Sequence, residues 1–374
     1  MSLSKEIEEK TDRLLRLCSE EGLGGVLINS QPNFSWVTAG GRSGVDLSRE
    51  PGAGTLFLRH DGMRFVLASK IEMDRLLSEE LEGQSYQPVE FAWEDEKANP
   101  SLVADLARSL VTGGLPLGTD LPSGGDVRLV AAAIARARYQ LTAAEVDRYK
   151  LLGRDAGKAI GDMARKLEPG ERERDVARRA IDALAAVGIY SVVTLVAADD
   201  RLKRFRHPVP TELQWKKVLM IVVCARRAGL IASLTRIVCD GAIPEDLVSW
   251  THGSAYVNAR LFNGTKPGVT GRELYELAAL AYSEAGFPGE EHLHHQGGAT
   301  GYQARDWAAH PLSTEKVQAA QAFAWNPSIT GSKVEETCIA FEDGIEIITA
   351  TQGWPAIPIE VEGRAYVLPG VLSL

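Results

Sequence analysis

The stretch Val218–Gly241, VLMIVVCARRAGLIASLTRIVCDG, decides how this chain is interpreted. It holds two runs of apolar and β-branched residues, Val218–Cys224 and Leu230–Cys239, and such runs are typical of buried β-strands. Three further segments follow it, and the interpretation depends on their order and spacing. They are His294–Asp306 (HHQGGATGYQARD), Phe323–Ile329 (FAWNPSI) and Val334–Ile339 (VEETCI).

Length and composition indicate an ordinary globular protein. The chain has 374 residues, enough for two domains of about 150 residues each. Apolar residues make up 45% and charged residues 24%, close to the average for soluble domains. The formal net charge is −9, and no run of Lys or Arg stands out. Nucleic acid and anionic membrane surfaces are therefore not expected partners.

The N-terminal sequence and the cysteines predict a cytoplasmic protein. The first residues, MSLSKEIEEKTDRLLRL, lack the apolar segment of a signal peptide. No window reaches the ~18 apolar residues of a spanning helix. The four cysteines are scattered and form no CxxC motif, so we expect reduced thiols rather than a disulfide framework. They are Cys18, Cys224, Cys239 and Cys338.

Helix and strand patterns alternate in the first part of the chain and predict a small α/β domain, residues 1–140. Glu72–Leu81 has a helical pattern, and the Pro- and Gly-rich stretch Pro116–Gly125 is expected to be a loop. Residues 141–374 are expected to form an α+β domain that opens with a long helix, Ala143–Leu167. Further helices are predicted at Glu171–Ala186, Pro244–Asn263 and Gly271–Glu284.

Taken in order, the four segments resemble the superfamily of creatinase, prolidase, Xaa-Pro aminopeptidase and methionine aminopeptidase. The leading domain resembles the N-terminal domain of creatinase and prolidase, including Asn33–Trp36 and Thr38–Gly40. The resemblance implies a pita-bread α+β domain preceded by a smaller α/β domain. It also implies a homodimer.

The metal-binding positions of that superfamily are mostly changed here. In its metallo-members two Asp, one His and two Glu hold a pair of divalent cations, which activate water. The resemblance places Val222, Ser233, Gly298, Asn326 and Glu335 at these five positions. Only Glu335 keeps the ligand type. One carboxylate cannot hold two divalent ions against their hydration, so we expect no metal and no other cofactor.

Other departures resemble creatinase, a metal-free member. Arg305-Asp306 follows the glycine turn, where creatinase has Arg-Glu and the peptidases have His-Glu. Asn326 stands where creatinase keeps a Glu, which argues against creatine itself as the substrate. The implied function is metal-independent hydrolysis of a C–N bond in a small, carboxylate-bearing molecule.

Three residues are candidate catalytic groups. His207 matches a substrate-contacting histidine of the family and suits acid–base work because its unperturbed pKa lies near neutral pH; the alternative is a loop histidine that bonds only backbone. Arg305 suits a substrate carboxylate, or else an ion pair with Asp306 or another acid. Glu335 could bind a cationic nitrogen or polarise water, or else form a buried ion pair with Arg236.

Five further residues are candidate substrate contacts. They are His294, Asn326, Tyr302, Ser233 and Gly298. His294 lies four residues before the changed ligand position, where Xaa-Pro-cleaving members have a substrate-facing His. Asn326 offers a donor and an acceptor, or else only forms the turn before Pro327. Tyr302 lines the site or simply packs. His295 is expected to be mainly structural.

The glycines Gly297, Gly298 and Gly301 have a G-G-x-x-G spacing, which is not that of a nucleotide-binding loop. Near a site, they let backbone approach a ligand closely. Arg42 and Arg49 are expected to be surface residues, although an N-domain loop of the partner subunit helps to close the creatinase site.

Two other functions stay open. One is a catalytically inactive, ligand-binding homologue, which the changed ligands favour. The other is a metallo-peptidase for Xaa-Pro bonds with an atypical site. In each case the expected partner is a small molecule or a short peptide.

Overall fold

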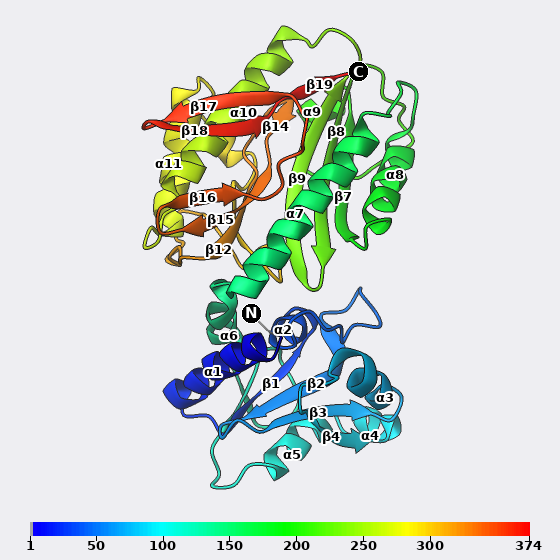
Figure 1. Ribbon diagram of the computed structural model, residues 1–374, viewed down its shortest axis with the longest axis vertical. Coiled ribbons are helices and arrows are strands. Elements are labelled where there is room, and N and C mark those ends of the chain that lie inside the picture. The colour runs from blue at the N-terminus through cyan, green and yellow to red at the C-terminus, as the bar shows by residue number, and fades with distance from the viewer. Residues whose placement is uncertain (1–2) are drawn as a thin grey trace. The chain divides into compact units, whose positions relative to one another are not determined.

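The computed structural model describes residues 3–374 (Figure 1). The chain forms two compact units, Met1–Ala144 and Glu145–Leu374. Each unit has its own sheets and its own buried core.

A single six-stranded sheet organises the first unit, in the order β4-β3-β2-β1-β5-β6. Its strands are β1 (Gly25–Ser30), β2 (Pro51–Arg59), β3 (Arg64–Ser69), β4 (Gln87–Phe91), β5 (Leu117–Thr119) and β6 (Val127–Leu129). Its helices are α1 (Leu3–Glu21), α2 (Gln31–Val37), α3 (Met73–Arg75), α4 (Trp93–Ala98), α5 (Leu102–Ser109) and α6 (Ala131–Tyr139). A π-helical turn, η1 (Leu76–Glu80), follows α3.

Two local predictions for this unit need correction. The segment Pro116–Gly125 is not all loop, because β5 lies within it and pairs in parallel with β1, Leu117 opposite Gly25. The neighbouring strand supplies hydrogen bonds that local glycine content does not reveal. The predicted helix Glu72–Leu81 is α-helical only over Met73–Arg75 and continues as η1.

Asn33 has a structural role at the end of β1. Its side-chain amide donates to Asp120 Oδ2 at 2.8 Å, and Ser30 Oγ donates to the same oxygen at 2.7 Å. Asp120 follows β5, so this carboxylate ties the start of α2 to the neighbouring strand.

Four sheets build the second unit, with strand orders β19-β9-β8-β7, β11-β10-β12-β15-β16, β13-β14 and β17-β18. The first of these sheets contains β7 (Tyr190–Ala198), β8 (Val218–Arg227), β9 (Leu230–Cys239) and β19 (Val371–Ser373). The two-stranded sheet β17-β18 contains β17 (Ala356–Val361) and β18 (Arg364–Pro369). The remaining strands are β10 (Gly297–Thr300), β11 (Trp307–Ala308), β12 (Gln321–Trp325), β13 (Ser328–Ile329), β14 (Ser332–Lys333), β15 (Glu336–Phe341) and β16 (Gly344–Ile347).

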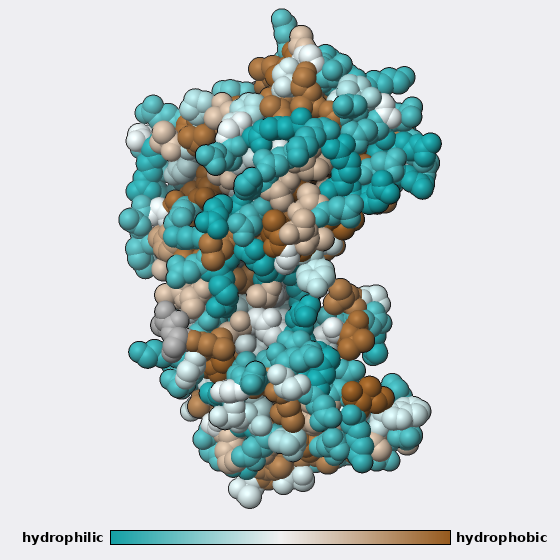
Figure 2. Space-filling view, turned by 45° about the vertical axis from the view of Figure 1, so that its right-hand side comes forward, coloured by the Kyte–Doolittle hydropathy of each residue, from teal (hydrophilic) through white to brown (hydrophobic). Residues whose placement is uncertain are grey.

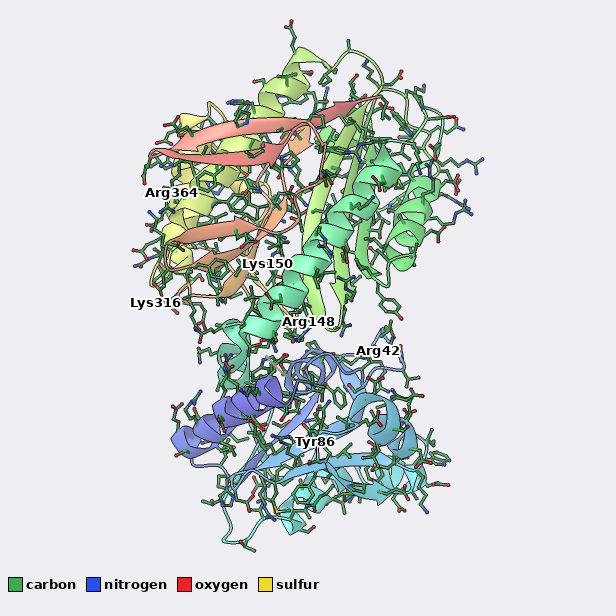
Figure 3. The ribbon with its side chains drawn as sticks, in the orientation of Figure 1. Arg42, Tyr86, Arg148, Lys150, Lys316 and Arg364 are labelled. Carbon is green, nitrogen blue, oxygen red and sulfur yellow. The ribbon has the colours of Figure 1, made fainter. Side chains whose placement is uncertain are left out.

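Helices cover these sheets (Figure 1). They are α7 (Ala143–Ala164), α8 (Glu173–Ala185), α9 (Arg201–Arg204), α10 (Glu245–Gly264) and α11 (Gly271–Glu284), with a 3-10 turn η2 (Glu290–His292). On α7, Gly157 comes so close to the chain after β16 that a Cβ would lie 2.6 Å from Thr349 O. Lys150 of α7, labelled in Figure 3, ion-pairs with Glu346 at 2.6 Å. Close backbone approach and this ion pair hold α7 against the β15–β16 region.

The β8–β9 hairpin positions the candidate site. Its register pairs Val222 with Thr235 and Cys224 with Ser233. Because side chains alternate along a strand, these four residues point to the same face of the hairpin. Apolar residues on both strands bury the hairpin, and every residue of β9 is buried.

The surface is largely hydrophilic on the face that Figure 2 shows, as the 24% charged content predicts. Within residues 3–374, no helix combines the length and the apolar character that crossing a bilayer requires.

Candidate functional site

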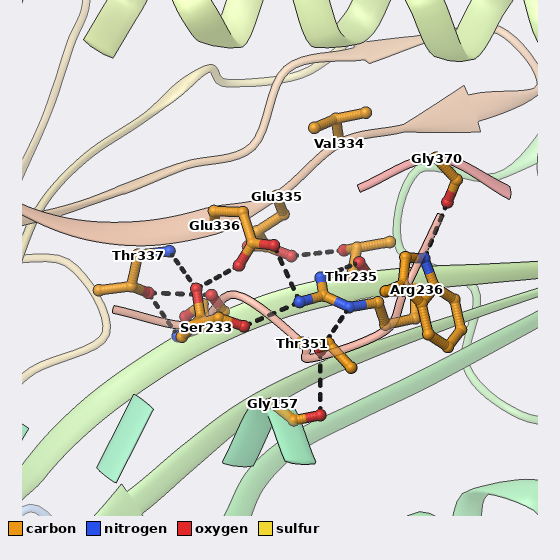
Figure 4. Close-up of polar contacts among 12 residues, drawn as sticks. Gly157, Ser233, Thr235, Arg236, Val334, Glu335, Glu336, Thr337, Thr351 and Gly370 are labelled. Carbon is orange, nitrogen blue, oxygen red and sulfur yellow. Dashed lines mark hydrogen bonds and ion pairs between the residues drawn. The ribbon is translucent and has the colours of Figure 1, made fainter. Parts of the chain in front are cut away.

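Neutral side chains occupy the hairpin face where the resemblance places the two Asp ligands. Ser233 is fully buried, and its hydroxyl donates to Cys224 Sγ at 3.2 Å. Its backbone N–H donates to Thr337 Oγ1 at 2.8 Å. Val222 is 3% exposed and packs with apolar residues such as Met220 and Leu247. Figure 4 shows Ser233 in its contact with Thr337.

The backbone leaves no room for a side chain at Gly298. A Cβ there would lie 2.1 Å from Trp307 O and 2.8 Å from Ala308 Cα. Gly298 lies in β10, and both of these atoms belong to the backbone of the neighbouring strand β11. A histidine at this position does not fit the present fold.

Glu335 is buried and held by two cations of the chain. Lys333 Nζ lies 3.0 Å from Glu335 Oε2, and Arg305 Nη2 lies 3.9 Å from Oε1. Thr235 Oγ1 donates to Oε2 at 2.7 Å. Burial alone raises the pKa of Glu335, but Lys333, Arg305 and the hydrogen bonds outweigh it, and the pKa is lowered. The carboxyl group is therefore ionised and already neutralised.

Its neighbour Glu336 takes the partner that the sequence suggested for Glu335. Arg236 Nη2 lies 2.8 Å from Glu336 Oε1, and both side chains are buried. Burial raises the pKa of Glu336, against the opposing effect of Arg236. The expected alternative of a Glu335–Arg236 ion pair is therefore wrong. Arg236 pairs with Glu336 (Figure 4), and Lys333 pairs with Glu335.

Three histidines gather beside this charge cluster. His294 Nε2 lies 3.2 Å from His207 Nε2, and the rings of His294 and His295 stack with centroids 4.3 Å apart. One ring nitrogen from each residue lies within 4.8 Å of the other two. We call His207, His294 and His295 the histidine cluster.

Burial of His294, partial burial of the exposed residues His207 and His295, and nearby cations keep these imidazoles neutral. Burial first, then Lys333 and the other histidines, lowers the pKa of His294 to about 2. Burial, Arg305 and Lys333 lower the pKa of His295 to about 4. Burial and Lys333 also lower the pKa of His207, although Glu335 opposes them. Neutral imidazole can accept a proton or coordinate a cation.

Arg206 fixes the loop that carries His207. Its guanidinium ion-pairs with Glu290 and donates to Thr330 Oγ1 at 2.9 Å. Glu290 also accepts from the backbone N–H of Thr330 at 3.0 Å. This network joins the loop after α9 to η2 and to the turn after β13, and η2 directly precedes His294. His207 and His294, which are 87 positions apart in the sequence, are thus brought into contact.

Several buried polar atoms near the cluster lack a hydrogen-bond partner among residues 3–374. They are His294 Nδ1, Arg305 Nε and Asn326 Oδ1. Asn326 is 3% exposed, and its backbone N–H donates to Gln296 O at 3.0 Å. Buried polar groups are normally satisfied, so these atoms indicate a place for a ligand.

The predicted site residues therefore divide into two groups. His207, His294, Arg305 and Glu335 are brought together. Ser233 is instead hydrogen-bonded to Cys224 and Thr337, and Gly298 lies in β10, where the backbone of β11 leaves no room for a side chain. The hydroxyl of Tyr302 donates to Glu145 Oε1 at 2.6 Å and its ring is 1% exposed, which fits its packing alternative.

Arg42, labelled in Figure 3, has a side chain that is 63% exposed, as its surface interpretation expects. Its backbone N–H donates to Glu80 Oε2 at 2.7 Å.

Sequence reasoning assigned no role to Lys333 and only a structural one to His295. Lys333 ends β14 and lies only two residues before Glu335, and this short spacing was the available signal. No local pattern reveals His295, because its neighbour His207 comes from a distant loop.

The five positions do not fit a pair of divalent cations. Val222 and Gly298 offer no ligand atom, and Ser233 and Asn326 offer neutral oxygens. The single carboxylate, Glu335, is already bound to Lys333. Hard divalent ions need several oxygen ligands with compensating charge, and this donor set lacks them.

Comparison with known proteins identifies the family. Residues 147–349, more than half of the chain, match the model of metallopeptidase family M24. A search of curated proteins finds no match.

Solved structures share the fold over nearly the whole chain. The prolidase of Pyrococcus horikoshii OT3 is 17% identical, with a TM-score of 0.75 over 92% of this chain and 99% of that one. The Xaa-Pro dipeptidase of Bacillus anthracis is 19% identical, with a TM-score of 0.74 over 92% and 97%. The N-terminal domain of the FACT complex subunit SPT16 from chickpea (Cicer arietinum) is 12% identical, with a TM-score of 0.70 over 92% and 96%.

These identities show a common fold, and the predicted pita-bread architecture is confirmed. The fold alone does not assign an activity, since a subunit of a complex shares it with two peptidases. The match of residues 147–349 assigns the family: this chain belongs to metallopeptidase family M24.

Proposed function

We propose that this M24 member hydrolyses a C–N bond in a small, carboxylate-bearing molecule without the paired metal ions of its family. One observation carries the proposal: the remaining ligand, Glu335, is bound by Lys333 at 3.0 Å and faced by Arg305 at 3.9 Å. Side-chain cations thus supply positive charge beside the carboxylate that would otherwise bind metal.

Charge around Glu335 favours an anionic ligand. Lys333 and Arg305 carry two positive charges against the one negative charge of Glu335. Arg305 Nε has no partner among the described residues, so its planar guanidinium is available to a carboxylate. Binding a carboxylate there neutralises the excess charge and satisfies the unpaired donor.

In this proposal His207 activates water. Its neutral imidazole accepts a proton as the water oxygen bonds to the electrophilic carbon, and it returns that proton to the nitrogen as the C–N bond breaks. The side chain of His207 is exposed, so a substrate can reach it. Asn326 Oδ1, which is buried and unpartnered in residues 3–374, accepts a hydrogen bond from the nitrogen end.

The test is a hydrolysis screen with chelator-treated full-length protein. Small N-acyl amino acids, amidines and cyclic amidines with a carboxylate form one set, and Xaa-Pro dipeptides with Mn²⁺ or Co²⁺ form the other. The proposal expects turnover in the first set that chelator leaves unchanged and that His207→Asn lowers at least about a hundredfold. Activity confined to Xaa-Pro peptides and dependent on added metal would overturn it.

The second candidate is a ligand-binding homologue without turnover. The changed ligand positions favour it, as does the likeness to a structure named as a subunit of a complex. It predicts that carboxylate-bearing ligands bind to wild type and to His207→Asn alike while the whole screen stays blank.

Two expectations from the sequence are kept as proposals. The first unit acts as a creatinase-type N-terminal domain, and the protein is a homodimer. Light scattering on a size-exclusion column tests the dimer, which a mass near one chain, 40.5 kDa, would contradict.

A further inference from the structure

We propose that the histidine cluster is a binding site for one transition-metal ion of the zinc class. Its ligand atoms are ring nitrogens of His207, His294 and His295. None of these is among the five positions that the family uses for its paired ions. The site is thus a different one, built from the loop after α9 and the loop after η2.

The distances suit a shared ion. Zinc binds histidine nitrogen at about 2.0–2.1 Å in tetrahedral geometry, which separates neighbouring ligand atoms by about 3.3 Å. His207 Nε2 and His294 Nε2 are 3.2 Å apart. The third nitrogen lies within 4.8 Å of the other two. His295 is exposed, so its ring can rotate by the small amount that closes this gap.

Imidazole selects the kind of ion. Three neutral nitrogen ligands suit Zn²⁺, Co²⁺, Ni²⁺ and Cu²⁺, whereas Mg²⁺ and Mn²⁺ prefer oxygen. Arg206, Arg305 and Lys333 all act on the cluster with positive charge, and Glu335 acts with negative charge. The excess of positive charge limits affinity and favours an anion in the open fourth position that three-ligand zinc sites keep.

A simpler arrangement is a hydrogen bond between two histidines. One Nε2–H of the His207–His294 pair would donate to the other Nε2, and His295 would only stack. This arrangement predicts that His295 contributes nothing to ion binding. Zn²⁺ binding by the His295→Ala variant therefore distinguishes the two arrangements.

The inference stands apart from the proposed hydrolysis because it is measured as binding. If both hold, the two functions compete for the same atom. An ion on His207 Nε2 removes the lone pair that accepts a proton from water, so zinc would inhibit turnover.

The experiment uses untagged full-length protein that has been treated with chelator and desalted. Calorimetric titration with Zn²⁺ is expected to give one ion per chain. Titration with Co²⁺ is expected to give the visible absorption bands of four-coordinate Co²⁺ with nitrogen ligands. His295→Ala is expected to weaken Zn²⁺ binding at least about tenfold, because one of three ligands is lost.

His292→Ala is the matched control. His292 lies three residues away, its side chain is 71% exposed, and it is outside the cluster, so its loss should leave binding unchanged. Circular dichroism confirms that each variant is folded. Absence of Zn²⁺ binding, equal binding by His295→Ala and wild type, or binding abolished by Glu335→Gln but kept by His295→Ala would each overturn the proposal.

Discussion

Arg236 and Arg305 both lie beside a buried glutamate, yet their surroundings differ. Arg236 is 1% exposed and contacts Glu336 at 2.8 Å; its guanidinium also donates to Thr235 O, Thr349 O and Thr351 Oγ1. Arg305 is 22% exposed, approaches Glu335 only to 3.9 Å, and leaves Nε without a partner among residues 3–374.

This difference distinguishes an arginine that stabilises the fold from one that is able to bind a ligand. A guanidinium whose donors are all used can only hold the fold together. One with a free donor, partial exposure and loose pairing can exchange its contact for a ligand. We therefore assign Arg236–Glu336 to stability and propose Arg305 with Glu335 for binding.

Arg236→Met should have the largest effect on stability. The change leaves Glu336 buried without its partner, which typically costs about 3–5 kcal/mol. Urea unfolding followed by circular dichroism measures the loss. The double variant Arg236→Met/Glu336→Gln should recover part of it because no charge stays unpaired. A loss of unfolding free energy below about 1 kcal/mol would mean that Arg236 stabilises the fold no more than Arg305 does.

Gly298→Ala should destabilise by about 1–3 kcal/mol because its Cβ would overlap the backbone of the neighbouring strand β11. The matched control is Gly301→Ala, where a Cβ would meet only Asp306 Oδ2, at 3.2 Å. The same urea assay compares the two variants. Equal stability would mean that β10 can accept a side chain and that the family histidine is not excluded by the backbone.

Acidification should destabilise the protein through His294. Its pKa is lowered to about 2 in the fold, against about 6.5 in an unfolded chain. Below pH 6.5 the unfolded state therefore binds a proton that the folded state refuses. Stability should fall as pH drops from 7 to 5, by up to about 1.4 kcal/mol per pH unit. His294→Asn should reduce this slope in unfolding titrations, while His295, whose pKa is also lowered, still contributes to it; an unchanged slope would contradict a neutral, buried His294.

Arg305→Met should change stability least, by less than about 1 kcal/mol, because its ion pair is loose and partly exposed. Its proposed role predicts a rise in KM for a carboxylate-bearing substrate of at least about tenfold. Steady-state kinetics measure that rise, with Arg305→Lys retaining part of the binding. A stability loss as large as that of Arg236→Met would assign Arg305 to the fold instead.

Apolar periodicity predicted the long elements. The structure gives Leu230–Cys239 as β9 and Gly271–Glu284 as α11, with the bounds that the sequence indicated. Short elements depend on their neighbours, and β5 therefore escaped detection: its three residues are stabilised by β1.

Ion partners were harder to foresee. Glu335 lies just before β15 and Glu336 is its first residue; Arg236 pairs with Glu336 and Lys333 with Glu335. Sequence alone did not say which glutamate pairs with Arg236. The contact between His207 and His294 joins the same two segments as the Arg206–Glu290 ion pair, and no local motif predicts either contact.

The most direct test of the central claim counts ions in protein supplied with excess Mn²⁺ or Co²⁺ and then desalted. Elemental analysis compares wild type with Glu335→Gln. We expect at most one ion per chain, with a content that Glu335→Gln does not alter. Two ions per chain that disappear in Glu335→Gln would contradict it and restore the paired metal site of the family.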